Sequence, residues 1–351
     1  MRHVIGTMTG TSMDGIDAVS ISVQGYGLEI KASFLEMATE PIDDLQQQLR
    51  HLATGTGCDT DLKEASLQVG RKTLHAITQL GIDNIDLIAL HGQTIFHDPP
   101  KSVQLIDTSP IENQFSCTIL TDPRAADLQL GGQGAPITPL ADWVMFRDQT
   151  CDTAVVNLGG FCNITILPKN CTPDDILGFD LCCCNLLLDA IARERLGLPF
   201  DQSGEHAMQG EVHDALCNKL KSKLQEQYNQ QRSLGSNDDL GAWILEQSSQ
   251  TQTNDLLATT TKAIGSFIQS MTASTTRILI AGGGVHNEAL VKAIGINAQK
   301  TDTFGVPTQA REAMAMAILG TLATDGVSIT LPQITGRQKT SNLVGWTQAS
   351  P

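Results

Sequence analysis

A glycine-rich segment between two apolar runs constrains the fold more than any other feature of this sequence. The segment 6–15 (GTMTGTSMDG) holds three glycines, four hydroxyl side chains and one carboxylate. Residues 16–23 alternate between apolar and polar side chains, which predicts a β-strand and makes 6–15 a turn between two strands. Glycine lets backbone N–H groups approach an anion closely, and the hydroxyls add donors. The pattern therefore favours an anion-binding turn over the alternative, a plain hairpin turn.

The same plan returns at 153–167, where an apolar strand (153–158), Gly159 and Gly160, and a second strand (161–167) follow one another. Two copies predict two similar α/β halves that face one cleft and hold a polyphosphate from both sides. The segment GGQGAP at 131–136 is the best candidate for a linker. We therefore expect an N-terminal lobe at 1–134 and a C-terminal lobe at 135–351.

Polar side chains follow two short apolar strands of the first half. The strand 86–90 runs into His91 and the sequence GQT, and the strand 118–121 runs into Asp122, Arg124 and Asp127. Open α/β sheets bind ligands at the carboxyl ends of their strands. Arg124 could grip a carboxylate or phosphate with its two-pronged guanidinium, or could pin a loop through an Asp–Arg pair. His91 could equally be a buried core histidine.

The second half offers a candidate general base and a candidate nucleoside site. Asp180 lies between an apolar segment and a helix expected at 186–196, where the helix dipole favours a carboxylate. Its alternative role is a simple helix N-cap. The strand 277–281 ends in three glycines, Gly282 to Gly284, with Asn287 near the next helix start, which suits a nucleoside lying against bare backbone. The spacing is not that of a dinucleotide-binding fingerprint.

Composition excludes several classes of partner. The net charge is −15 and the pI about 4.8, which argues against nucleic acid or an anionic membrane. We expect no signal peptide and no transmembrane helix, because glycines interrupt the apolar residues near the N-terminus. The nine cysteines include no C-x-x-C pair, so reduced thiols in a cytoplasm are expected rather than disulfides or a zinc site.

Eight segments in order carry a resemblance to a known family over nearly the whole chain. They are GTMTGTSMDGIDA (6–18), HGQT (91–94), DPRAADLQLGGQGAP (122–136), VVNLGGFCNIT (155–165), GFD (178–180), GGGVHN (282–287), EAMAMAILG (312–320) and LPQITG (331–336). Together they resemble the anhydro-N-acetylmuramic acid kinase family of the sugar-kinase/Hsp70/actin superfamily.

The resemblance implies an α/β fold of two ribonuclease-H-like (actin-like ATPase) lobes around a central nucleotide cleft. It also implies ATP and Mg²⁺ as cofactors, a cytoplasmic homodimer, and a role in peptidoglycan recycling and amino sugar metabolism. In the family reaction, water opens a 1,6-anhydro sugar while the freed O6 takes the γ-phosphoryl group.

The family motifs imply roles for particular residues of this chain. Asp180 matches the catalytic base, and Asp14 is the candidate for holding hydrated Mg²⁺. The residues implied near the sugar are His91, Thr94, Arg124 and Glu312. Those implied at the nucleotide are Gly10, Thr11, Ser12, Met13, Asp14, Gly15, Ile16, Asp17, Gly159, Gly160, Gly282, Gly283, Gly284 and Asn287.

One motif departs from the family pattern. After GFD the family continues with Thr-Gly-Pro-Gly/Ala-Asn, whereas this chain has Leu181, three cysteines (Cys182 to Cys184) and Asn185. The cysteines either fill space as small apolar residues or include a reactive thiol at a helix start. The departure leaves two alternatives to the family activity: a kinase for another sugar, or a nucleotide-binding regulator with little turnover.

Overall fold

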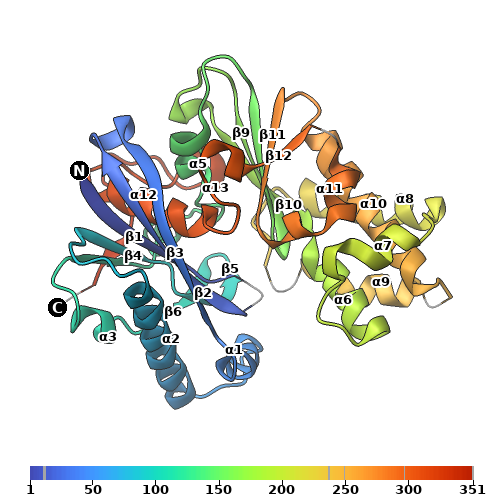
Figure 1. Ribbon diagram of the computed structural model, residues 1–351, viewed down its shortest axis with the longest axis horizontal. Helices are drawn as coiled ribbons and strands as arrows, with labels where there is room; N and C mark the ends of the chain where they lie inside the picture. The colour runs from blue at the N-terminus through green and yellow to red at the C-terminus, as the bar shows by residue number, and fades with distance from the viewer. Residues whose placement is uncertain (11–12, 236–237, 249, 296, 350–351) are drawn as a thin grey trace. The chain divides into compact units, whose positions relative to one another are not determined.

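The computed structural model describes residues 1–351 except 11–12, 236–237, 249, 296 and 350–351. The chain forms two compact units (Figure 1). Unit 1 comprises Met1–Arg147, Thr172–Ile176 and Phe304–Pro351, and unit 2 comprises Asp148–Cys171 and Leu177–Thr303. This division differs from the boundary expected after residue 134, because 135–147 and the C-terminal segment belong to unit 1.

The sheet of unit 1 has the strand order β13-β7-β4-β1-β2-β3. The first three strands in sequence form an antiparallel meander, and β4 and β7 then run parallel to β1. The predicted turn at 6–15 joins β1 to β2, with Met8 opposite Asp17. The strands are β1 (Arg2–Met8), β2 (Gly15–Gln24), β3 (Lys31–Pro41), β4 (Leu87–Leu90), β7 (Thr118–Thr121) and β13 (Thr347–Gln348).

The sheet of unit 2 repeats this plan in the order β10-β9-β8-β11-β12. Again three strands form an antiparallel meander, and β11 and β12 continue parallel to β8. Apart from the additional edge strand β13 of unit 1, the two sheets have the same order and directions, which confirms the predicted pair of ribonuclease-H-like halves. The strands are β8 (Thr153–Leu158), β9 (Phe161–Leu167), β10 (Leu177–Cys183), β11 (Arg277–Ala281) and β12 (Ala298–Lys300).

Helices cover both sheets, and one hairpin stands apart from them. Unit 1 contains α1 (Leu45–Ala53), α2 (Asp59–Gln79), α3 (Ser109–Glu112), α4 (Ala125–Gln129), α5 (Pro139–Phe146), α12 (Arg311–Thr324), α13 (Pro332–Thr335) and the hairpin of β5 (Gln93–Asp98) and β6 (Lys101–Leu105). Unit 2 contains α6 (Asn185–Leu196), α7 (Glu205–Gln209), α8 (Asp214–Asn229), α9 (Gly241–Gln247), α10 (Thr253–Met271) and α11 (Glu288–Ile294). Within the described part of the chain, no helix has the length and apolar character needed to span a membrane.

Helix α12 packs directly on the backbone of β1 (Figure 1). A Cβ atom on Gly6 would lie 2.1 Å from the carbonyl oxygen of Ala313 and 2.4 Å from the amide of Ala317, so only glycine fits there. Ile5, the neighbour of Gly6 on β1, points to the other face and joins the core formed with α1 and α2. The close approach fixes where α12 begins, and therefore where Glu312 lies.

Candidate active site

The glycine-rich turn of unit 1 is closed by a backbone hydrogen bond in which Met13 N–H donates to the Gly10 carbonyl over 3.2 Å. Met13 is buried and has φ +55°, a conformation that costs free energy for a residue other than glycine. Asp14 is exposed, and its carbonyl accepts from Ile42 N–H. Thr11 and Ser12, both predicted to contact the nucleotide, lie outside the described residues.

Gln93, the first residue of β5, stabilises this turn through two side-chain hydrogen bonds. Its side-chain oxygen accepts from the Thr9 hydroxyl over 2.6 Å, and its amide nitrogen donates to the Gly10 carbonyl over 3.2 Å. The side chain is fully buried, and its bond to the Thr9 hydroxyl is protected from water, while its bond to the Gly10 carbonyl is partly buried. Gln93 was not among the predicted site residues, although its place inside the HGQT motif was the available signal.

His91 orients the side chain of Arg124 by a hydrogen bond. Arg124 Nη2 donates to His91 Nε2 over 3.0 Å, while Nη1 donates to the Gly134 carbonyl over 2.6 Å. Burial, and then the charge of Arg124, lower the pKa of His91 to about 3. The ring is therefore neutral, and because Nε2 accepts, the proton is on Nδ1, which donates to the Gly92 carbonyl over 2.8 Å.

The loop at 131–134 is pinned by Asp127, which is fully buried. Its carboxylate accepts from Gly134 N–H and from the Thr335 hydroxyl, each over 2.8 Å, and lies 3.6 Å from Arg337 Nε. The side chain of Arg124 bonds to His91 and to the carbonyl of this loop. Asp127 therefore forms its ion pair with Arg337, and the Asp–Arg pair considered for Arg124 stays a prediction.

Three predicted carboxylates of unit 1 influence one another electrostatically. Burial, together with the charges of Glu312 and Asp14, raises the pKa of Asp17 to about 6 against the opposing effect of the hydrogen bond from the Thr39 hydroxyl. Burial also raises the pKa of Glu312, while Arg311 and Arg124 lower it. Arg124 is thus close enough to Glu312 for its positive charge to lower the pKa of that carboxyl group.

Thr94, the remaining predicted sugar contact, lies on β5 and its hydroxyl donates to Gln104 Oε1 over 2.6 Å. Gln104 is on the facing strand β6, directly opposite Thr94 in the register. The bond fixes the side chain within the hairpin, and contact with a sugar stays a prediction.

Asp180 lies inside β10 and not at a helix start. The residue at the N-cap of α6 is Cys184, so the alternative role of Asp180 as an N-cap is wrong. A shift in strand register falls between Asp180 and Cys182, where β10 pairs with β9. The Oδ2 atom of Asp180 accepts from Leu234 N–H over 2.8 Å.

The predicted second glycine turn, between β8 and β9, is held by the N-cap and the first residue of α6. The Gly160 carbonyl accepts from Cys184 N–H over 2.9 Å, and the Gly159 carbonyl accepts from Asn185 N–H over 3.1 Å. The Asn185 side chain also donates to the Leu158 carbonyl over 2.9 Å. Backbone amides at the start of a helix have no partner within the helix. Here the amides of Cys184 and Asn185 bond to the carbonyls of the turn and so stabilise it.

The three glycines after β11 have different surroundings. Gly282 has φ +84°, and a Cβ on Gly284 would lie 2.7 Å from that of Leu158. Around Gly283, by contrast, no atom of the described chain lies within 4 Å of the position of a Cβ. Asn287 caps α11 by accepting from Leu290 N–H over 3.0 Å. The open space at Gly283 fits the predicted nucleoside contact, whereas Asn287 already has a structural role.

A comparison with known families identifies the chain. The family model for anhydro-N-acetylmuramic acid kinase matches residues 2–348. The chain belongs to this family.

Named relatives agree with the assignment. The anhydro-N-acetylmuramic acid kinase of Aliivibrio fischeri is 31% identical, with 98% of each chain covered. That of Synechococcus elongatus is 32% identical, covering 95% of this chain and 96% of the relative.

Among solved structures, component A of the (R)-2-hydroxyglutaryl-CoA dehydratase of Acidaminococcus fermentans matches 92% of this chain and 98% of its own, with 12% identity and a TM-score of 0.48.

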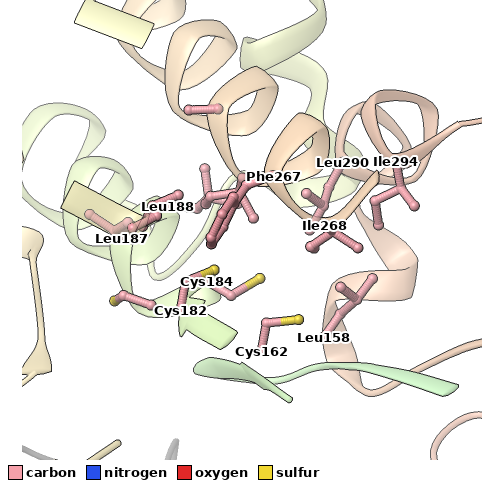
Figure 2. Packing of buried hydrophobic residues seen from close by; sticks show 14 of the residues in the cluster. Leu158, Cys162, Cys182, Cys184, Leu187, Leu188, Phe267, Ile268, Leu290 and Ile294 are labelled. Atoms are coloured by element: carbon pink, nitrogen blue, oxygen red, sulfur yellow. The ribbon is translucent and has the colours of Figure 1, made fainter. Parts of the chain in front are cut away.

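The motif in which this member of the anhydro-N-acetylmuramic acid kinase family departs from the pattern lies in the core of unit 2 (Figure 2). Cys182, Cys183 and Cys184 are fully buried, in one cluster with Cys162, Leu187 and Phe267. Burial raises the pKa of all three thiols, that of Cys183 to about 12. These observations favour the alternative in which the cysteines fill space as small apolar residues over a reactive thiol at the helix start, because desolvation of the thiolate outweighs the helix dipole.

The donor set fits a hydrated Mg²⁺ better than a protein cage. In the described ranges, no group of three or more His, Cys, Asp or Glu side chains is arranged to hold a metal ion. Mg²⁺ typically keeps several waters and takes one or two carboxylates plus substrate phosphates. Asp14, exposed at the glycine-rich turn, is a carboxylate of the kind such an ion uses.

Proposed function

We propose that this protein is an ATP-dependent kinase that converts 1,6-anhydro-N-acetylmuramic acid to N-acetylmuramic acid 6-phosphate in peptidoglycan recycling. The observation that carries the proposal is the family match over residues 2–348. The retention of Asp180 and Asn185 on either side of the divergent cysteines supports it.

Asp180 acts as the general base in this proposal. Its carboxylate takes a proton from a water molecule as the water oxygen bonds to the anomeric carbon. The bond from that carbon to O6 breaks, and O6 bonds to the γ-phosphorus of ATP while the bond to the β–γ bridging oxygen breaks and ADP leaves. General base catalysis contributes a factor of about 10²–10⁴ to such a step.

Arg124 and Glu312 contact the sugar in this proposal. The sugar carries a lactyl carboxylate, and a protein with a net charge of −15 needs a local cation to receive it. The bonds from Arg124 to neutral His91 and to the Gly134 carbonyl support this role, because they orient the guanidinium without neutralising it.

The glycine-rich turns contact ATP in this proposal, with Asp14 as the protein ligand of Mg²⁺ and Gly283 beside the nucleoside. Bound Mg²⁺ would neutralise charge on the transferring phosphoryl group. Gln93 supports phosphate binding by fixing the Thr9 hydroxyl and the Gly10 carbonyl. We place the enzyme in the cytoplasm, in keeping with its nine free cysteines.

A panel of sugars, each with ATP and Mg²⁺, tests the proposal through release of ADP. We expect turnover of the anhydro sugar and a 6-phosphate product. Turnover of a different sugar alone would replace the substrate, and ATP binding without any turnover would favour a regulator. A homodimer stays a prediction, which light scattering would test.

A further inference from the structure

A short loop of unit 2 reaches the Asp180 carboxylate with its backbone. Of this loop the structure describes residues 230–235 and 238–240, between α8 and α9. Leu234 N–H donates to Asp180 Oδ2 over 2.8 Å. The contact joins residues far apart in sequence, so it depends on how the loop is held.

An ion pair between Arg232 and Asp238 links the two described parts of this loop. Arg232 Nη1 and Nη2 donate to the two oxygens of Asp238 over 2.9 Å and 2.5 Å. The same carboxylate accepts from Gly235 N–H over 2.8 Å, and Arg232 Nη1 donates to the Ser233 carbonyl over 2.8 Å. Leu234 therefore lies between Ser233 and Gly235, whose backbone groups both bond to the side chains of the ion pair. The Asp238 side chain is 8% exposed and that of Arg232 41%, so the carboxylate of this bidentate pair is shielded from water while the guanidinium is not.

Gln227, a buried residue of α8, ties the loop to the strand that carries Asp180. Its side-chain nitrogen donates to the Asp238 carbonyl over 2.7 Å, and its side-chain oxygen accepts from Cys183 N–H over 3.0 Å. Cys183 is at the end of β10, the strand of Asp180. Loop and strand are thus held at a fixed distance by a side chain that water does not reach.

We propose that Arg232 and Asp238 are positioning residues that orient the Asp180 carboxylate through Leu234 N–H. The inference rests on the proposed function, in which Asp180 is the base. One Asp180 oxygen bonded to a backbone amide fixes the rotation of the carboxylate, and with it the direction in which the base faces water. Misplacing a catalytic group by about 1 Å can cost on the order of 10²-fold in rate.

A double-mutant cycle separates this role from a general loss of stability. Arg232→Met should lower kcat for the anhydro sugar by about tenfold and leave KM for ATP unchanged, and Arg232→Lys should recover part of the loss. In an Asp180→Asn background, Arg232→Met should change the residual kcat less than twofold, because its effect passes through the carboxylate. Lys223→Met, which removes an exposed ion pair with Glu226 on α8, is the matched control and should leave kcat unchanged. Equal losses from Arg232→Met in both backgrounds would overturn the proposal.

Hydrogen exchange gives a readout that needs no activity. Asp180→Ala should speed deuterium uptake in the peptide containing Leu234, and Arg232→Met should do the same, while Lys223→Met should not. If Asp180→Ala leaves that uptake unchanged, the positioning role is excluded. If the wild-type protein shows this coupling but does not turn over the anhydro sugar, the proposed function fails and the ordering of Asp180 by the loop stands.

Discussion

At the residue scale, Arg124 is oriented by a histidine that stays neutral at physiological pH. A protonated His91 would repel the guanidinium, and burial prevents that protonation. The sequence indicated both residues as candidates because each follows a buried strand. It could not show that one supports the other, because their contact joins the ends of β4 and β7, which become neighbours only in the sheet.

Removing the acceptor behind Arg124 should weaken binding of the sugar. His91→Phe keeps the ring volume but leaves a guanidinium N–H without its partner, so KM for the anhydro sugar should rise about tenfold, as a hydrogen bond to a charged group contributes roughly 1.5–3 kcal/mol. His91→Gln restores an acceptor near Nε2 and should recover most of the loss. Steady-state kinetics measure both variants. A larger rise in KM for ATP than for the sugar would assign Arg124 to the nucleotide.

The same histidine should make stability depend on pH. The pKa of His91 is about 3 in the folded protein, below the unfolded value near 6.5. Between these values the unfolded chain binds the proton and the folded chain does not, so His91 lowers the free energy of unfolding as the pH falls. Urea denaturation at pH 7.5 and pH 5 should therefore show a larger loss for wild type than for His91→Gln. Equal losses would mean that His91 titrates normally in the folded state.

At the element scale, local patterns predicted the short buried strands well. The strands expected at 118–121, 153–158 and 161–167 match β7, β8 and β9, because an apolar run bounded by turn residues is a local signal. Asp180 shows the limit of such signals. Its place inside β10 follows from pairing with β9, which a pattern along one segment does not report.

The cysteines of β10 and the α6 start should resist alkylation. Treating the native protein with iodoacetamide should label the exposed Cys58 and leave Cys182 to Cys184 unmodified, with activity retained, because the thiolate is the reactive form. Peptide mass spectrometry locates the labels, and the same treatment in denaturant should label every cysteine. Loss of activity through labelling of Cys184, prevented by sugar and ATP together, would restore the reactive-thiol interpretation.

At the scale of the whole molecule, the last part of the chain completes the first unit. Helix α12 packs on β1 at Gly6, and its first residue, Arg311, pairs with Asp142 of α5 inside the core. Both side chains are almost fully buried, and Arg311 also donates to the Thr138 hydroxyl over 3.2 Å. A linker motif at 131–136 could not predict this return, because the fit of α12 to Gly6 depends on distant residues.

Breaking the buried pair should destabilise unit 1 strongly. Arg311→Met leaves the Asp142 carboxylate buried without that cation, which typically costs about 3–5 kcal/mol. Urea denaturation should show this loss in the free energy of unfolding, and Lys223→Met on the surface should change it by less than about 0.5 kcal/mol. A loss for Arg311→Met as small as that of the control would mean that water reaches the pair.

The return of α12 to β1 also bears on how the ribosome makes this protein. The β1 face beside Gly6 emerges early, and its covering helix is translated only after all of unit 2. At about 5–20 residues per second, that apolar face waits on the order of ten seconds or more without its partner. During synthesis, unit 2 can fold before unit 1 is complete. Chaperones that shield nascent apolar strands should therefore matter more for residues 1–147 than for the rest of the polypeptide.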